Sequence, residues 1–399
     1  MIGIGLAFSG IILSWIIYQT SIAQPPSSEM PLPYHNVETG GYYHTKWWYE
    51  EVENQDLVTG DAVARLANDV ALITGGNAGI GKGIAVELCK LGVGTVVITS
   101  RSLNRAKKTV TELVEDGICK KGQIQGMQVD LADLDSVHAL ANDFKSRFSK
   151  LNYFVENAGG VIIPGQYPGP HVNKEGFEAL YAGNYLGHFL LLQLLLDLIE
   201  SSHPARISLT SSIAHWGVTN NLTSLLPTKG WDARKSQGNG TLIGAVEQYC
   251  NTKFLQIAMA FELQQRLGGN SHITITPTAP GFINTNIPSG NREKTMPPIN
   301  PLGRSPKHGA ETTLHALFSK SIEGKTGYFL QPYWSPLHQN LPLGPLGLSV
   351  LLWEWLFQRI TWGCFMWLPH PKTHDLSFQK QLWEESLKVV GLGPPSSSV

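Results

Sequence analysis

Short runs of β-branched and aliphatic residues alternate with amphipathic stretches from Val70 onward, and this alternation limits the possible folds more than any other feature. The predicted strands span residues 70–74, 95–100, 124–130, 151–157, 205–212 and 272–278. The predicted helices between and after them are Ile80–Leu91, Leu103–Glu115, Leu134–Phe148, Glu175–Glu200 and Val246–Leu267. Strands that alternate with helices are joined by right-handed crossovers. The order therefore predicts the α/β class, with one doubly wound parallel sheet.

A glycine-rich turn, TGGNAGIG, follows the first predicted strand at residues 74–81 and opens the first predicted helix. Gly75, Gly79 and Gly81 permit a tight turn and a close approach of the backbone to a diphosphate. The helix N-terminus adds unpaired N–H groups and the positive end of the helix dipole. Such a turn alone is also compatible with an ordinary tight turn, but its place between a strand and a helix favours nucleotide binding.

The turn resembles the TGxxxGIG motif of the short-chain dehydrogenases/reductases, a family with a Rossmann-type domain. Four further signatures of that family follow in the expected order: Asp130-Leu131, Asn157-Ala158-Gly159 (with Glu156 where a second Asn is usual), Tyr249-Cys250-Asn251-Thr252-Lys253 as YxxxK, and Pro280-Gly281. The resemblance covers about residues 68–332. Within the family, the segments NYLGHF (184–189) and TSSIAH (210–215) look most like those of the retinol-dehydrogenase-like, lipid-active members.

The resemblance implies four catalytic residues that suit hydride transfer to a carbonyl, which leaves an alkoxide to be protonated. Tyr249 would exchange the proton, and Lys253, one helical turn later, would favour its phenolate because a free tyrosine titrates near 10. Ser212, with Ser211 as the fallback, would donate to the substrate oxygen. Asn184 resembles the asparagine that holds the family's proton-relay water.

The cofactor contacts implied by the same resemblance are Thr74, Gly75, Asn77, Gly79, Ile80, Gly81, Arg101, Asp130, Leu131, Asn157, Ala158, Gly159, Tyr249, Lys253, Pro280 and Gly281. The second strand ends in Ser100-Arg101 without the acidic residue that would bind a ribose 2′-hydroxyl. Arg101 instead offers a guanidinium to a 2′-phosphate, with Ser100 as a second donor. The sequence therefore favours NADP(H) over NAD(H), although a solvated arginine at a helix start is the plainer alternative.

Apolar segments stand at both ends of the chain. Residues 2–18 carry no charge and predict an N-terminal anchor within 1–23, or a signal peptide cleaved after Ala23. Residues 24–67 are interpreted as a linker or strap, 68–332 as the catalytic domain and 333–399 as a C-terminal extension. The extension contains the Trp-rich segment 347–368, which predicts an interfacial membrane helix, a collar over an oily pocket, or a helix that closes the core.

Composition narrows the function classes further. A net charge of −1 disfavours nucleic-acid binding. Four widely separated cysteines without a CxxC pair argue against both a zinc site and a disulfide framework, and no histidine pair has ligand spacing. Two glycosylation sequons begin at Asn221 and Asn239, and they matter only if the domain is lumenal.

These observations predict a membrane-associated enzyme, most simply of the endoplasmic reticulum, that uses NADP(H) to interconvert a lipophilic alcohol and its aldehyde or ketone. Retinoids, sterols and polyprenoids are the substrate classes expected, and a homo-oligomer is left open. An NAD-dependent steroid-type dehydrogenase and a non-catalytic nucleotide-binding scaffold are the alternatives. The presence of Asn184, Ser212, Tyr249 and Lys253 weighs against the scaffold, because nucleotide binding alone needs only the glycine turn.

Overall fold

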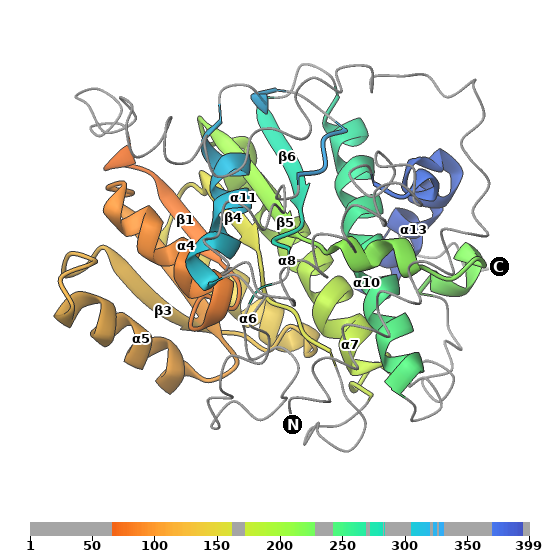
Figure 1. The fold of residues 1–399 in the computed structure, drawn as a ribbon, viewed down its shortest axis with the longest axis horizontal. Helices are drawn as coiled ribbons and strands as arrows, with labels where there is room; N and C mark the ends of the chain where they lie inside the picture. The colour runs from red at the N-terminus through yellow and green to blue at the C-terminus, as the bar shows by residue number, and fades with distance from the viewer. Residues whose placement is uncertain are drawn as a thin grey trace, which may run out of the picture.

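A six-stranded parallel sheet forms the centre of the molecule in the computed structural model (Figure 1). The structure describes residues 66–161, 172–227, 242–268, 272–281, 283, 305–319, 322–324, 327–330 and 369–393. The strands are β1 (Val70–Ile73), β2 (Thr95–Ser100), β3 (Ile124–Gln128), β4 (Tyr153–Glu156), β5 (Ala205–Thr210) and β6 (Ile273–Thr278). Their order in the sheet, β3-β2-β1-β4-β5-β6, and their parallel pairing confirm the predicted doubly wound α/β fold.

The strand order reverses between β1 and β4, which are neighbours in the sheet although two strand–helix units separate them in sequence. Ile73 of β1 pairs with Ile98 of β2 on one side and with Val155 of β4 on the other. In open α/β sheets a ligand binds outside the carboxyl ends of the strands at such a reversal. The topology therefore places the expected ligand above the ends of β1 and β4.

Helices cover both faces of the sheet. They are α4 (Gly79–Lys90), α5 (Leu103–Glu115), α6 (Leu134–Arg147), α7 (Ala179–Tyr181), η2 (Ala182–Leu186), α8 (Gly187–Glu200), η3 (Ile213–Gly217), η4 (Leu222–Leu225), α10 (Leu242–Leu267), α11 (Pro306–Phe318), η10 (Pro371–His374) and α13 (Leu376–Val389). One apolar core joins the sheet to α4, α5 and α11, and a larger one joins the other face to α6, α8, α10 and α13. Successive strand residues such as Leu72 and Ile73 enter opposite cores because side chains alternate across a strand.

The continuous helical stretch Ala179–Glu200 is the one described helix long and apolar enough to cross a membrane. Its most apolar window is 67% buried inside the protein, and Phe189, Leu192 and Leu195 belong to the larger core. Its apolar character is therefore explained by packing between the sheet and α6.

Two described helices were not among the predicted ones. Ser305 caps α11 by accepting a hydrogen bond from the His308 N–H, and Pro306 occupies the first turn, where its missing N–H costs nothing. Asp375 caps α13 in the same manner, accepting from Phe378 N–H at 3.0 Å. Both helices thus carry ordinary start signals in the sequence.

Helix α13 packs against α10 within the larger core. Trp383 lies edge-on to Phe189 with ring centroids 5.0 Å apart, and the guanidinium of Arg266 sits 5.0 Å from the Trp383 ring centroid. Tyr185 and Ser386 share a buried hydroxyl–hydroxyl hydrogen bond of 2.8 Å. The described end of the C-terminal region therefore contributes to the same core as the sheet.

The argument against disulfides from cysteine spacing is wrong for one pair. Cys89, near the end of α4, and Cys119, after α5, form a disulfide with their Cα atoms 5.1 Å apart. The two cysteines are 30 positions apart, and the chain between them leads out along β2 and back along α5. The topology therefore brings them together at the end of the sheet away from the glycine turn. Cys250 is buried and free.

Several predictions fall outside the described residues. They concern the anchor or signal segment 1–23, nearly all of the strap 24–67, the Trp-rich segment 347–368, and the sequon at Asn239.

Candidate active site

The glycine turn connects β1 to α4 in a backbone path that larger residues would block. Gly75 has φ +67° and Gly79 φ +55°, the left-handed region that favours glycine. A Cβ on Gly81 would lie 2.5 Å from Nδ2 of Asn157 and 2.6 Å from the Gly75 carbonyl oxygen. The turn is therefore closely packed against Asn157 on the side that faces the protein interior.

Thr74 ties this turn to the end of β4. Its hydroxyl oxygen accepts hydrogen bonds from the N–H groups of Asn157 and Ala158, both at 2.9 Å. Asn157 Nδ2 donates back to the Thr74 carbonyl oxygen at 2.9 Å. His188 Nε2 lies 2.9 Å from the Thr74 hydroxyl, and burial lowers the pKa of His188 to about 3, so the ring is neutral. These bonds join the two strand ends at the reversal point of the sheet.

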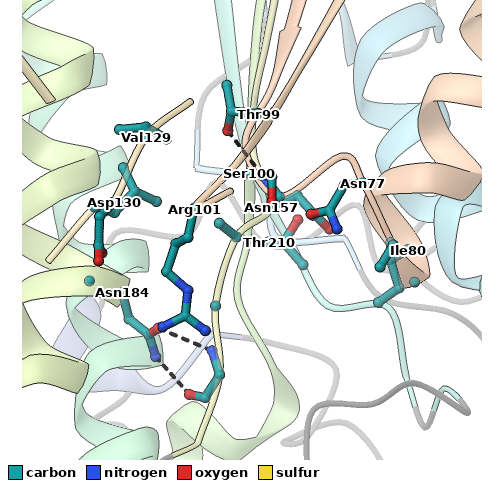
Figure 2. Close-up of a pocket in the computed structure, with 18 of the residues that line it drawn as sticks. Asn77, Ile80, Thr99, Ser100, Arg101, Val129, Asp130, Asn157, Asn184 and Thr210 are labelled. Carbon is teal, nitrogen blue, oxygen red and sulfur yellow. Dashed lines mark hydrogen bonds between the residues drawn. The ribbon is translucent and has the colours of Figure 1, made fainter. Parts of the chain in front are cut away.

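A cavity of about 460 Å³ opens over these strand ends (Figure 2). Of the residues predicted from the sequence, it is lined by Gly75, Asn77, Gly79, Ile80, Arg101, Asp130, Leu131, Asn157, Ala158, Gly159, Asn184, Tyr249, Lys253 and Pro280. Four predicted residues do not line it. Thr74 and Gly81 support the turn from beneath, and Gly281 follows Pro280 with φ +78°. Ser212 is outside the lining, whereas the fallback Ser211 lines the cavity.

One end of the cavity carries positive charge. Ser100 and Arg101 lie at the end of β2, and the Arg101 side chain extends into the cavity in Figure 2. Arg105 and Lys108, on α5, line the same end. Lys82, which could otherwise serve as an anion contact, is held in an ion pair with Glu112 at 2.8 Å.

The α5 contribution was largely missed from the sequence. Arg105, Lys108, Thr109 and Glu112 all line the cavity. Their spacing of three and four residues places them on one face of the helix, and that periodicity is the signal that could have found them. Thr109 also donates to the Asn77 carbonyl oxygen at 3.1 Å, which fixes the glycine turn against α5.

Tyr249 enters the other end of the cavity from α10. Burial raises the pKa of Tyr249 to about 12, and a hydrogen bond with the Ser212 side chain lowers it in part. The phenol therefore keeps its proton at neutral pH. Ser211 instead donates its hydroxyl to the Lys253 carbonyl oxygen at 2.7 Å, so Ser212, rather than the fallback, is the serine bonded to the tyrosine.

Lys253 lies one turn further along α10 and is only 3% exposed. Its ammonium donates to the Thr210 carbonyl oxygen at 2.6 Å and to Gln256 Oε1 at 2.9 Å. It stands 5.7 Å from the centroid of the Tyr249 ring. Burial lowers the pKa of Lys253 to about 7, while the nearby Glu156 carboxyl raises it, so the charge of this lysine is sensitive to pH near neutrality.

Glu156 is an unusual buried carboxyl beside this lysine. It ends β4, is fully buried, and neither of its oxygens has a hydrogen-bond partner among the described residues. Burial raises the pKa of Glu156 to about 8, and the positive charge of Lys253 lowers it. The carboxyl is thus mostly protonated at pH 7 and ionises when the pH rises.

Asn184 sits in a π-helical turn, η2, which interrupts the helix formed by α7 and α8. Its Oδ1 accepts from the Gly160 N–H at 3.1 Å, and its Nδ2 donates to the Gly160 carbonyl and to Thr252 Oγ1, both at 3.1 Å. A Cβ on Gly159 would lie 3.3 Å from Lys253 Nζ and 3.6 Å from Asn184 Oδ1. The bulge therefore turns the asparagine toward the loop after β4 and the lysine, as π-turns often do at functional sites.

Within the part of the chain that the structure describes, no group of three His, Cys, Asp or Glu side chains could hold a metal ion. The cavity instead combines a glycine turn, a cationic end and a Tyr–Lys pair. Fold and site together define a nicotinamide-dinucleotide-dependent oxidoreductase of the Rossmann type.

Comparison with known proteins identifies the family. The family model for short chain dehydrogenases matches residues 69–222. Retinol dehydrogenase 12 of Mus musculus is 30% identical over 267 residues, which cover 66% of this chain and 78% of that protein. The chain therefore belongs to the short-chain dehydrogenase/reductase family, is an oxidoreductase acting on CH–OH groups, and resembles the retinol-dehydrogenase-like members.

Two further dehydrogenases are similar to this chain. Polyprenol dehydrogenase of Homo sapiens is 29% identical over 270 residues, which cover 65% of this chain and 76% of that protein. A solved short chain dehydrogenase from Shigella flexneri 2a, complexed with NADP, is 20% identical, covers 67% of this chain and 98% of its own, and has a TM-score of 0.48.

Proposed function

We propose that the protein interconverts a lipophilic alcohol and its aldehyde or ketone with NADP(H), and that Tyr249, Ser212, Lys253 and Asn184 carry the proton chemistry. The observation that carries the proposal is that the glycine turn, Tyr249 and Lys253 line one cavity, with the Lys253 ammonium 5.7 Å from the centroid of the Tyr249 ring. The names of two relatives, a retinol and a polyprenol dehydrogenase, support an oily alcohol as the substrate class.

The residues present fit a dinucleotide. Gly75 and Gly79, both with positive φ, line the cavity and let the backbone approach a diphosphate, while Gly81 allows the turn to pack closely against Asn157. Asn77, Ile80 and Asp130 line the path from the turn to the cationic end of the cavity. The dinucleotide supplies or accepts the hydride when bound, and the protein's own residues hold the carbonyl group and move the proton.

In the direction of reduction, Tyr249 donates its phenolic proton to the developing alkoxide oxygen. The raised pKa suits this role because the donor stays protonated at neutral pH. Ser212 orients the phenol and offers a second hydrogen bond to the same oxygen. The Lys253 ammonium, when charged, stabilises the phenolate that remains after the transfer.

Reprotonation of the tyrosine requires a path to solvent. Lys253 and Asn184 both approach Gly159, and Asn184 reaches the Gly160 backbone in the loop after β4. A water held between these polar groups would complete the path from the phenolate to the cavity. Because Asn184 already binds Gly160 on both its amide atoms, its part in this path is to fix the loop after β4, which it also links to Thr252 on α10.

The preference for NADP(H) rests on charge at the end of β2. No acidic side chain follows this strand, and Arg101, Arg105 and Lys108 line the adjoining end of the cavity. Arg101→Asp should lower the affinity for NADPH roughly 10- to 150-fold, the equivalent of about 1.5–3 kcal/mol for one charge-assisted hydrogen bond. Titration with both cofactors measures this, and an unchanged preference would assign the 2′-phosphate to the α5 cations instead.

The activity itself is tested with purified full-length protein, NADPH and a panel of retinoid, sterol and polyprenoid carbonyls. Tyr249→Phe should lower turnover about 10²- to 10⁴-fold while cofactor affinity stays within about twofold, because it removes a proton donor only. Cys250→Ser, in the neighbouring buried position that faces away from the cavity, is the matched control. Full turnover by the Tyr249 variant would refute the assigned mechanism.

Membrane association is part of the proposal and rests on the apolar sequence at residues 2–18 and 347–368. Full-length protein should remain with membranes after a carbonate wash, and deletion of both segments should release it. A full-length chain processed after Ala23 and found in the soluble fraction would contradict the anchor.

A further inference from the structure

The exposed loop between the active-site serines and α10 carries a glycosylation triplet, Asn221-Leu222-Thr223. Asn221 caps η4, and both Asn221 and Thr223 are exposed. The Thr223 hydroxyl donates to Asn221 Oδ1 at 2.7 Å. Among the described residues no hydrogen bond engages Asn221 Nδ2. The amide nitrogen is therefore presented to solvent while its carbonyl is held by the threonine of the same triplet.

The surroundings of Asn221 leave room for a bulky group. Ser224, also exposed, donates to the Asn221 carbonyl oxygen at 2.6 Å and so fixes the backbone of the turn. Leu225, three residues later, is buried and accepts a hydrogen bond from the Tyr181 hydroxyl at 3.0 Å. The turn is thus anchored on its inner side and open on its outer side, and it does not line the cavity.

A second observation, far from this loop, points to the same compartment. The disulfide between Cys89 and Cys119 joins the end of α4 to the segment after α5, and both residues are at most 5% exposed. Stable buried disulfides form in oxidising compartments, whereas cytosolic thiols are kept reduced. The oxidising compartments of the secretory route are also those in which Asn-X-Thr triplets are glycosylated.

We propose that Asn221 carries an N-linked glycan and that the catalytic domain accordingly lies on the lumenal side of its membrane, with Cys89 and Cys119 oxidised. The reaction joins Asn221 Nδ2 to the anomeric carbon of an oligosaccharide carried on a lipid diphosphate. The bond from that carbon to the diphosphate oxygen breaks, the lipid diphosphate leaves with the electron pair, and the amide proton passes to a base of the transferase. This inference is independent of the proposed substrate and cofactor.

The experiment uses the full-length chain expressed in a eukaryotic cell, with gel mobility measured before and after digestion by a peptide-N-glycosidase. The variants are made in an Asn239→Gln background, so that one triplet remains. The expected result is a shift that is lost in Asn221→Gln and in Thr223→Ala but retained in Thr223→Ser, which preserves the triplet. Asn220→Gln, one residue outside it, should also retain the shift. Because Asn239 begins the other triplet of the chain, Asn239→Gln is compared in the same gel.

Thiol labelling gives a second, independent measurement. Denatured, unreduced protein should leave two more thiols unlabelled by a maleimide than the same protein after reduction, and Cys89→Ser and Cys119→Ser should each abolish that difference. A mobility that the glycosidase does not change, or a shift that persists in Asn221→Gln, would overturn the glycan at Asn221. Full labelling of Cys89 and Cys119 without reduction would overturn the lumenal placement. Neither outcome bears on turnover. The Asn221→Gln variant should turn over substrate at the same rate as the parent protein.

Discussion

Replacement of the buried Glu156 by glutamine is expected to stabilise the protein at neutral pH. Glu156 is fully buried at the end of β4 without a hydrogen-bond partner among the described residues, and burial raises its pKa to about 8. In the unfolded chain the carboxyl ionises near its ordinary pKa of 4.5. Above that pH, unfolding releases a proton that the folded state holds, so rising pH favours the unfolded state.

The magnitude follows from the two pKa values. Each pH unit between them adds about 1.4 kcal/mol against folding. At pH 7 the carboxyl therefore costs about 3 kcal/mol, and at pH 5 about 1 kcal/mol. Glu156→Gln removes the ionisation with almost no change in volume, but it also removes the attraction that raises the pKa of Lys253. The gain should accordingly fall somewhat short of these values and grow from pH 5 to pH 8.

Chemical denaturation of the purified protein at pH 5, 6, 7 and 8 measures the effect. Glu156→Asp is the matched control, because it keeps a titrating carboxyl and should preserve the pH slope even though the lost methylene lowers stability overall. A Glu156→Gln variant that is less stable than the parent at pH 8, or whose gain is equal at pH 5 and pH 8, would refute the reasoning. In that case the carboxyl would have a favourable partner in the folded protein.

Two further predictions concern the cofactor site and the lysine. Gly81→Ala should abolish dinucleotide binding, because its Cβ would lie 2.5 Å from Asn157 Nδ2 and 2.6 Å from the Gly75 carbonyl oxygen. Fluorescence titration measures the affinity, and an affinity equal to that of the parent protein would refute the packing argument. Lys253→Met should lower turnover about 10²-fold or more. In the parent enzyme, turnover in the direction of reduction should fall as the pH rises through about 7, where the buried ammonium loses its charge, and a rate unchanged from pH 6 to pH 9 would contradict this.

The fold could be predicted well because its signals are local. Each strand contains aliphatic or aromatic residues that mark it in the sequence, and β2 has the predicted bounds of residues 95–100. The fourth helix is shorter than predicted: it begins at Ala179 rather than Glu175, because Glu178 accepts from the N–H groups of Leu180 and Tyr181 as its cap. The π-turn inside that helix has no signal in hydrophobic periodicity, since it preserves the buried face.

The site was predicted only where motifs mark it. Tyr249 and Lys253 share one helix, so their proximity follows from spacing alone. The carboxyl of Glu156 meets Lys253 across two strands and a helix, and the pairing of Cys89 with Cys119 depends on how α5 returns along the sheet. Such contacts arise from tertiary packing. Neither the spacing of the cysteines nor the presence of Glu156 in place of the usual Asn indicates them. The face of α5 that carries Arg105 and Lys108 is an intermediate case. The helical spacing of these residues is visible in the sequence and could have predicted that they share one face.

The position of α13 at the end of the chain has a consequence for biosynthesis. Phe378, Leu382 and Trp383 belong to the same core as β1 and α8, which are made more than 170 residues earlier. A nascent chain therefore exposes the apolar surface that α13 covers until α13 itself has been made. The Cys89–Cys119 segment, by contrast, is complete early in synthesis. Oxidation of that pair can precede closure of the core, so a covalent link can form while the surface that α13 will cover is still exposed and prone to aggregation.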